Sequence, residues 1–244
     1  MDASQAAAAP SRVLDIRDVH AWYGESHVLH GLTLHVNQGE VVTLLGRNGA
    51  GRTTTLRAIL GLTGRRTGSI RINGKESIEL PTHRIAHLGL GYCPEERGIF
   101  SSLSAEENLL LPPLVGARAS AMSVADIYEM FPNLYERRGS QGTRLSGGEQ
   151  QMLAVARILR TGARLLLLDE ISEGLAPIIV QALARMIRKL KATGYTIVMV
   201  EQNFRFAAPL SDRFYVVEHG QIKLSCSADE LEARTPSLNK LLGV

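Results

Sequence analysis

A glycine-rich loop between a short apolar run and a helical pattern constrains the fold of this chain most strongly. The apolar, β-branched run is Val41–Leu45, and the helical pattern begins after residue 51. Glycines in such a loop let backbone N–H groups point at phosphate oxygens, and the N-terminus of the following helix adds partial positive charge. This context predicts a phosphate-binding P-loop, in which the hydroxyl group of Thr53 would ligate Mg²⁺. The residues of this loop and helix start are Gly46, Arg47, Asn48, Gly49, Ala50, Gly51, Arg52, Thr53 and Thr54.

Position 52 departs from the strict P-loop pattern, which has Lys where this chain has Arg52. Arginine keeps the positive charge, but its planar guanidinium is bulkier than the slim ammonium group of lysine. Taken alone, the loop is explained about equally well by a glycine-rich turn that caps an ordinary helix. A second motif is therefore needed to decide between the two hypotheses.

That second motif is an apolar run that ends in two carboxylates, Asp169 and Glu170. The run Leu165–Leu168 shows no polar alternation, which is typical of a strand covered on both faces. Ligands of open α/β sheets bind at the carboxyl edge of such strands. We expect Asp169 to hold the Mg²⁺ shell and Glu170 to orient and polarise an attacking water.

The order of the apolar runs predicts an α/β fold with a mostly parallel core sheet. The first two strands have a short connection, which indicates an antiparallel β lobe, and a helical insertion is expected at about residues 94–160. We expect a flexible N-terminus in residues 1–12 and one domain over residues 13–244. Helices are expected after Gly51, Gly147, Pro177 and Ser227, and strands at Val13–Val19, Val28–Val36, Val41–Leu45, Ser69–Ile72, Leu165–Leu168, Thr196–Val200 and Phe214–Val217.

Composition excludes several classes of protein. Of the 244 residues, 45% are hydrophobic and 21% charged, which is typical of a globular domain and not of a disordered chain. No segment offers the roughly 20 apolar residues that a membrane-spanning helix needs. The net charge is only +3. The arginine pairs at residues 65–66 and 137–138 are more typical of solvated surface than of a nucleic-acid site. No nucleic-acid partner is predicted.

The segment from Leu145 to Gln151 decides the class of protein. Its Ser146 and Glu149 fit a capping box at a helix start. A capping box does not explain the adjacent Gly147 and Gly148, because glycine costs helix stability. Glycines at a helix N-terminus are useful if a phosphate must approach the backbone closely.

Together with Asp169 and Glu170, this segment resembles the signature of the ATP-binding-cassette (ABC) ATPases, and the resemblance covers essentially the whole chain. The family implies the P-loop NTPase fold of ABC ATPases, with ATP and Mg²⁺ as ligands. It also implies a head-to-tail dimer, in which the P-loop of one subunit and the Ser146–Glu149 signature of the other enclose each ATP. By the same resemblance, Tyr23 would stack on adenine, Gln202 would act in catalysis, and Glu95 would join Thr53 and Asp169 at Mg²⁺.

One branch of the family is similar in further segments, namely the second ATPase subunit of branched-chain amino-acid importers. The matching segments are residues 91–100, 106–109, 174–180, 200–203 and, in part, 241–244. The branch implies a peripheral subunit on the cytoplasmic face of the cell membrane. It also implies as partners two polytopic membrane subunits, a second ABC ATPase and an extracytoplasmic substrate-binding protein.

Two other functions stay open at this point. Arg52 and Ile171, which stands where Pro usually follows Asp-Glu, suggest a regulatory cassette that binds ATP but hydrolyses it weakly. Soluble, non-transport ABC ATPases usually have tandem cassettes or a long coiled-coil insertion, and this chain has neither. The sequence contains no information on the transported substrate or on whether the chain pairs with itself or with a sister ATPase.

Overall fold

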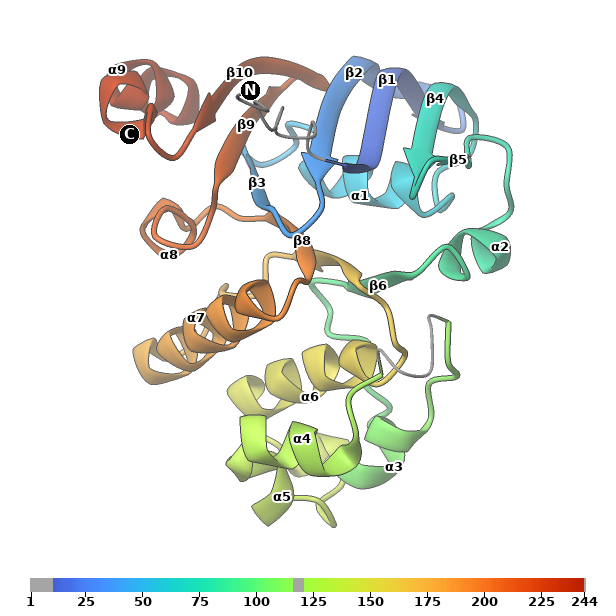
Figure 1. Cartoon of the computed structure of the whole chain (residues 1–244), viewed down its shortest axis with the longest axis vertical. Coiled ribbons are helices and arrows are strands. Elements are labelled where there is room, and N and C mark those ends of the chain that lie inside the picture. Colours follow the sequence, from blue (N-terminus) through green and yellow to red (C-terminus); the bar gives the residue numbers. More distant parts are fainter. Residues whose placement is uncertain (1–10, 116–120, 244) are drawn as a thin grey trace, which may run out of the picture.

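A six-stranded sheet crosses the middle of the molecule in the computed structural model, which describes residues 11–115 and 121–243 (Figure 1). Neighbouring strands along β9-β3-β8-β7-β6 are parallel, and β10 pairs antiparallel with β9 at the edge. The prediction of a mostly parallel core is therefore confirmed. The strands are β3 (Val41–Leu45), β6 (Leu90–Cys93), β7 (Leu165–Asp169), β8 (Thr196–Val200), β9 (Arg213–Glu218) and β10 (Gln221–Ser227).

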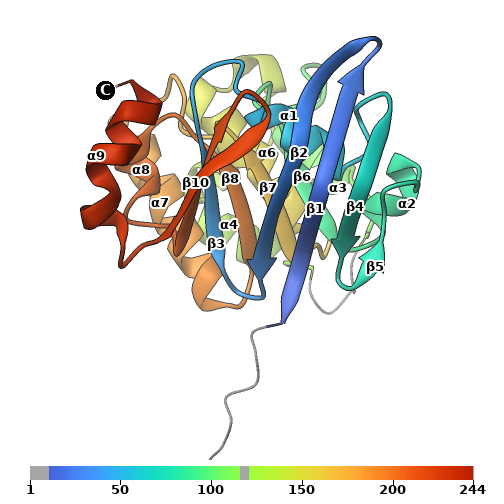
Figure 2. The ribbon, with the colours of Figure 1, turned by 90° about the horizontal axis from the view of Figure 1, so that it is seen from above.

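A second sheet, with strand order β2-β1-β4-β5, is entirely antiparallel. The predicted antiparallel lobe is confirmed, and seen from above its strands lie in front of the central sheet (Figure 2). The helix α1 (Arg52–Ile59) lies under this sheet in Figure 1. The strands are β1 (Arg12–Tyr23), β2 (Ser26–Asn37), β4 (Arg66–Ile72) and β5 (Lys75–Glu76).

The helices within residues 105–159 lie together below α7 (Pro177–Ala192) and β6 (Figure 1). Three of them begin with a serine capping box, at Ser104, Ser123 and Ser146, which satisfies backbone N–H groups of the first turn. None of the described helices is long and apolar enough to cross a membrane. The helices are α2 (Thr82–Ala86), α3 (Ala105–Leu110), α4 (Val124–Met130), α5 (Pro132–Glu136), a 3₁₀ turn η2 (Gly142–Arg144), α6 (Gly147–Leu159), α7 (Pro177–Ala192), α8 (Phe204–Ala207) and α9 (Leu231–Leu242).

Side chains of β7 alternate between two apolar cores, one on each face of the central sheet. Leu165 and Leu167 belong to the core shared with the antiparallel sheet and α1. Leu166 and Leu168 belong to the core shared with α6 and α7. The expectation that this strand is covered on both faces is confirmed. The edge of the sheet that carries Asp169 is therefore held in place from both sides.

Three strands were not predicted from the sequence, namely the two-residue β5, β6 and β10. The strand β6 is only four residues long and contains Gly91, whose Cα packs so closely that a Cβ would lie 3.2 Å from Ala163, Ile158 and Leu166. The strand β10 is amphipathic and directly follows a tight turn. At the N-terminus, β1 begins at Arg12, and residues 1–10 of the predicted flexible segment lie outside the described residues.

The double coverage of β7 has a measurable consequence. Leu167 is fully buried, so Leu167→Ala should lower the free energy of unfolding by about 2–5 kcal/mol through lost burial and a cavity. The control is Leu62→Ala, because Leu62 is 48% exposed and its truncation should change the value by less than about 0.5 kcal/mol. Urea denaturation of both variants checks the difference, and similar losses in both would contradict it.

Candidate functional site

The P-loop is held in a conformation that two of its positions can adopt only as glycine. Gly46 has a φ of 155°, and a Cβ there would lie 2.4 Å from the carbonyl oxygen of Val217. Gly51, the N-cap of α1, has a φ of 106° and lies close to Gly220 in the β9–β10 turn. Gly220 in turn donates its N–H to the carbonyl of Ala50 (2.8 Å). Its own carbonyl accepts from the N–H of the β2 residue at position 30 (2.9 Å). The loop is therefore fixed by two other parts of the fold.

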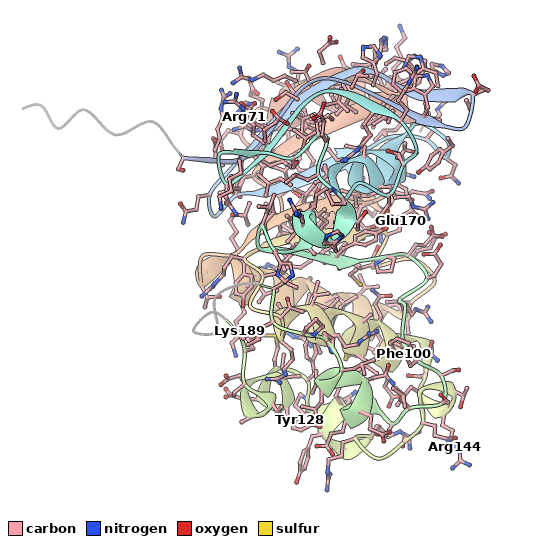
Figure 3. All side chains as sticks on the ribbon, turned by 90° about the vertical axis from the view of Figure 1, so that its right-hand side faces the viewer. Arg71, Phe100, Tyr128, Arg144, Glu170 and Lys189 are labelled. Carbon is pink, nitrogen blue, oxygen red and sulfur yellow. The ribbon has the colours of Figure 1, made fainter. Side chains whose placement is uncertain are left out.

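The loop borders a hollow of about 390 Å³ that gathers residues from distant segments. The P-loop and the first turn of α1 form one wall, and the segments after β6, β7 and β8 contribute the acidic and amide side chains. Figure 3 shows Glu170 at the level where the β-rich half meets the helical half. The lining residues are Val28, Asn48, Gly49, Gly51, Arg52, Thr53, Thr54, Glu95, Glu170, Glu173 and Gln202.

Asp169 lies at the bottom of this arrangement and is only 1% exposed. Its carboxylate accepts hydrogen bonds from the hydroxyl of Thr53 (3.1 Å) and from that of Tyr92 on β6 (3.2 Å). Burial raises the pKa of Asp169 to about 6, although the two hydrogen bonds act in the opposite direction. A hydroxyl and a carboxylate this close are oxygen ligands that suit Mg²⁺, so the two residues fit the predicted metal site.

Arg52 is 4% exposed and carries a guanidinium with an unused donor. Its Nη2 donates to Oε1 of Glu170 (2.9 Å) and to Oδ1 of Asn48 (3.2 Å). Its Nη1 is buried and has no hydrogen-bond partner among the residues that the structure describes. A buried unsatisfied donor costs about 1–3 kcal/mol. An anionic group bound in the hollow would supply the missing acceptor, so Arg52 fits a phosphate ligand.

Glu170 is held between Arg52 and Gln202, with Nε2 of Gln202 donating to Oε2 (2.9 Å). It adopts a positive φ of 48°, which is unusual for a residue with a side chain. The pKa of the neighbouring Glu173 is raised to about 7, mainly by a hydrogen bond with Glu170 and to a smaller extent by burial. Oxygens of Glu95, Glu170 and Glu173 lie within 4.8 Å of one another. The structure thus groups Glu95 with these two glutamates, whereas Thr53 and Asp169 form a pair of their own.

Glu201 and Tyr92 are site residues to which the sequence analysis gave no role. Glu201 is 1% exposed and accepts hydrogen bonds from the hydroxyl (2.7 Å) and the backbone N–H (3.2 Å) of Ser172. Burial raises the pKa of Glu201 to about 7. The contact links the segment after β7 to the segment after β8. The available signal for Glu201 was its position between the apolar run of β8 and Gln202. A role for Tyr92 could be predicted only with knowledge of β6.

The signature residues lie in the helical half and do not border the hollow of their own chain, as its described lining shows. Ser146 caps α6, and its N–H donates to Oε2 of Glu149 (2.7 Å). Gly148 packs on α7, where a Cβ would lie 2.7 Å from Cγ1 of Ile179. Phosphate approach is therefore not needed to explain this glycine. A Cβ on Gly147 would have its nearest neighbour at 3.5 Å, so no such constraint applies there.

Tyr23 ends β1 and is 38% exposed. It lies beside Arg57 of α1, and a hydrogen bond with Tyr23 is the main cause of the raised pKa of that guanidinium. Its ring is exposed and so is accessible to a ligand, and stacking of Tyr23 on adenine stays a prediction.

The raised pKa of Asp169 predicts a pH-dependent effect of its removal. In the ligand-free protein with EDTA present, Asp169→Asn should raise the free energy of unfolding at pH 8 by about 1–3 kcal/mol, because a buried charge is replaced by a neutral amide. The gain should fade as the pH falls through 6 toward 4, because the native carboxyl is then already protonated. Urea denaturation at several pH values measures this. The exposed Asp229 provides the control Asp229→Asn, and a less stable Asp169→Asn at pH 8 would contradict the expectation.

Comparison with known proteins agrees with this geometry. A family model described as "ABC transporter" matches residues 29–173. A high-affinity branched-chain amino acid transport ATP-binding protein, BraG of Pseudomonas aeruginosa, is 42% identical over 86% of this chain and 91% of its own length. The lipopolysaccharide export system ATP-binding protein LptB of Escherichia coli is 35% identical over 82% of this chain and 84% of its own. A solved ATP-binding subunit of an ABC transporter superposes with a TM-score of 0.78 and 28% identity, covering 95% of this chain and all of that one. The resemblance recognised from the sequence is confirmed, and the chain belongs to the ABC transporter family.

Proposed function

We propose that this chain is the ATP-binding and ATP-hydrolysing subunit of an ABC importer for branched-chain amino acids or related small molecules. The observation that carries the proposal is the 42% identity to BraG along nearly the full length of both chains. The identity to LptB, whose name assigns it to lipopolysaccharide export, is lower at 35%. The importer is therefore favoured over an exporter.

Binding of ATP is supported by the wall that the P-loop and α1 build along the hollow. Backbone N–H groups of the glycine-rich loop and the start of α1 present partial positive charge to the phosphates. Thr53 and Asp169 would hold Mg²⁺, which neutralises charge on the β- and γ-phosphate oxygens when bound. Arg52 would give its unused Nη1 donor to a phosphate oxygen.

Hydrolysis requires Glu170 to orient a water for in-line attack on the γ-phosphate. In the ligand-free chain one oxygen of Glu170 is occupied by Arg52 and the other by Gln202. A phosphate competes with Glu170 for the guanidinium, because a phosphate carries more charge than a carboxylate. Phosphate binding would then release Glu170 toward the water, and Gln202 would donate to the γ-phosphate in place of the more usual histidine.

A dimer is supported by the position of the signature outside the hollow of its own chain. Ser146, Gly147, Gly148 and Glu149 would reach the ATP bound by a second cassette, either a copy of this chain or a sister ATPase. As part of the same proposal, the assembly docks on two polytopic membrane subunits at the cytoplasmic face and works with an extracytoplasmic binding protein.

The buried Arg52–Glu170 ion pair also favours a second candidate, a regulatory cassette that binds ATP and hydrolyses it slowly. Both groups are almost fully buried, at 4% and 8% side-chain exposure. In such a site a retained ion pair would keep Glu170 from the water. The two functions predict opposite outcomes for substitutions at these positions.

Substitution of Arg52 should separate the two candidates. If phosphate binding already releases Glu170, Arg52→Lys keeps the positive charge on the phosphates and should leave kcat within about threefold of the parent. If the ion pair is retained with ATP bound, Arg52→Lys should free Glu170 and raise kcat by at least about tenfold, which corresponds to about 1.4 kcal/mol of the barrier. Glu170→Gln should lower kcat by about 10²–10⁴-fold while ATP still binds. Steady-state ATPase assays and calorimetric titration with ATP measure both effects.

The matched control is Arg188→Lys on α7, because Arg188 is exposed and lies outside the lining of the hollow. It should leave kcat within about twofold of the parent. A slow parent that binds ATP, with kcat raised at least about tenfold in Arg52→Lys, would instead support the regulatory cassette.

The importer assignment is tested by identifying the proteins that co-purify with this chain from native membranes. Affinity purification from detergent-solubilised membranes, followed by mass spectrometry, should recover two polytopic proteins and a second ABC ATPase or a second copy of this chain. Recovery of ribosomal or DNA-repair proteins without any membrane protein would overturn the transport function. The ATPase assignment would stand in that case.

A further inference from the structure

Histidines gather on one face of the β1–β2 hairpin, next to its turn. In the strand register His20 lies opposite His30, and Trp22 lies opposite His27. A register shift after Ala21 inserts an extra residue in β2, so that His27 and His30 share a face although they are three residues apart. Nδ1 of His20 and Nε2 of His27 are 3.0 Å apart. We propose that these two nitrogens bind a divalent transition-metal ion such as Zn²⁺.

The separation of the two nitrogens suits a shared ion. Zn–N bonds are about 2.0–2.1 Å long, so two imidazole nitrogens on one ion lie about 2.9 Å apart at a right angle and about 3.3 Å apart at a tetrahedral angle. The observed 3.0 Å between Nδ1 of His20 and Nε2 of His27 falls within this range. Both side chains are partly exposed, so an ion can reach them.

The other nitrogen of His20 has the orienting partner that histidine ligands usually have. Nε2 of His20 lies 3.5 Å from Oδ1 of Asp18. A carboxylate at this position favours the proton on Nε2, which leaves the lone pair of Nδ1 directed at His27. Asp18 adopts a positive φ of 48°. Its carboxylate lies over Gly31, where a Cβ would be only 2.8 Å from Oδ1. This strained residue therefore depends on the absence of a side chain opposite to it.

Stacked rings hold His27 in place. Trp22 is stacked on His27, with centroids 4.2 Å apart and planes at 10°. The guanidinium of Arg65 lies 3.9 Å from the same indole ring, so Trp22 is sandwiched between this cation and His27. His30 lies against His27, with centroids 4.0 Å apart. The ring of His27 is thus fixed before any ion binds.

The proton balance requires no change of charge on the protein. Without an ion, Nε2 of His27 donates its hydrogen to Nδ1 of His20. With an ion, that proton moves to Nδ1 of His27, both rings stay neutral, and two lone pairs ligate the metal. Imidazole nitrogen suits Zn²⁺, Cu²⁺ and Ni²⁺ better than Mg²⁺ or Ca²⁺. No third His, Cys, Asp or Glu of the described residues converges on these two nitrogens, so water would complete the coordination.

The test is calorimetric titration of ZnCl₂ into the full chain, carrying no polyhistidine tag and first stripped with EDTA. We expect one Zn²⁺ per chain, with binding weakened at least tenfold in His20→Asn and in His27→Asn. Asp18→Asn should weaken binding by about tenfold, as loss of an orienting carboxylate does, and asparagine tolerates the positive φ. Zn²⁺ should also raise the Tm of the parent but not that of His27→Asn.

Two controls separate this site from other candidates on the chain. His83 and His87 form an exposed pair on and just after α2, and the double variant His83→Gln with His87→Gln should bind Zn²⁺ as the parent does. Glu173→Gln removes a member of the acidic group and should also leave binding unchanged. Equal Zn²⁺ affinity in the parent and in His27→Asn would overturn the proposal. Loss of binding in either control with retention in His20→Asn would do so as well.

Discussion

The register between the parallel strands β3, β8 and β7 determines where the P-loop, Asp169, Glu170 and Gln202 lie relative to one another. Leu44 pairs with Val200, and Val200 pairs with Asp169, so one row of residues crosses three strands at the carboxyl edge of the sheet. The chain leaves this row into the P-loop, into the segment of Glu201 and Gln202, and into Glu170. The apolar cores on both faces hold the row in place, because a register slip by one residue would move each side chain to the opposite face of the sheet.

The site carries more negative than positive charge in the ligand-free chain. Asp169, Glu170, Glu173 and Glu201 outnumber the buried guanidinium of Arg52 at this edge of the sheet. The raised pKa values of Asp169, Glu173 and Glu201 are the physical result, because burial and neighbouring carboxylates disfavour their charged forms. A bound divalent cation would offset this excess of negative charge, and the phosphates of a nucleotide would balance the charge of the cation. On this ground the proposed nucleotide and metal ion would suit the site best when they bind together.

Local patterns allowed the P-loop, the β7 strand with its two carboxylates and the capped signature helix to be predicted from the sequence. Each of these depends on neighbours within about ten residues. Contacts between strands far apart in the chain could not be predicted, and the pairing of Tyr92 with Asp169 needs the missed strand β6. The ion pair between Arg52 and Glu170 could not be predicted either. The sequence showed that arginine replaces the lysine of the P-loop pattern, but not which carboxylate this arginine contacts. Gly148 has a further reason to be glycine that the sequence did not show, because a Cβ there would lie 2.7 Å from Cγ1 of Ile179.

Gly220 joins three segments that are far apart in the chain, by hydrogen bonds to the P-loop and to β2 and by a close contact with Gly51. A Cβ at this position would lie 1.9 Å from the carbonyl oxygen of Val28, so no other residue can take its place without moving the backbone. During synthesis the P-loop leaves the ribosome well before Gly220, the residue that locks it. A nascent chain therefore lacks this lock on the nucleotide pocket until Gly220 has been translated and has emerged.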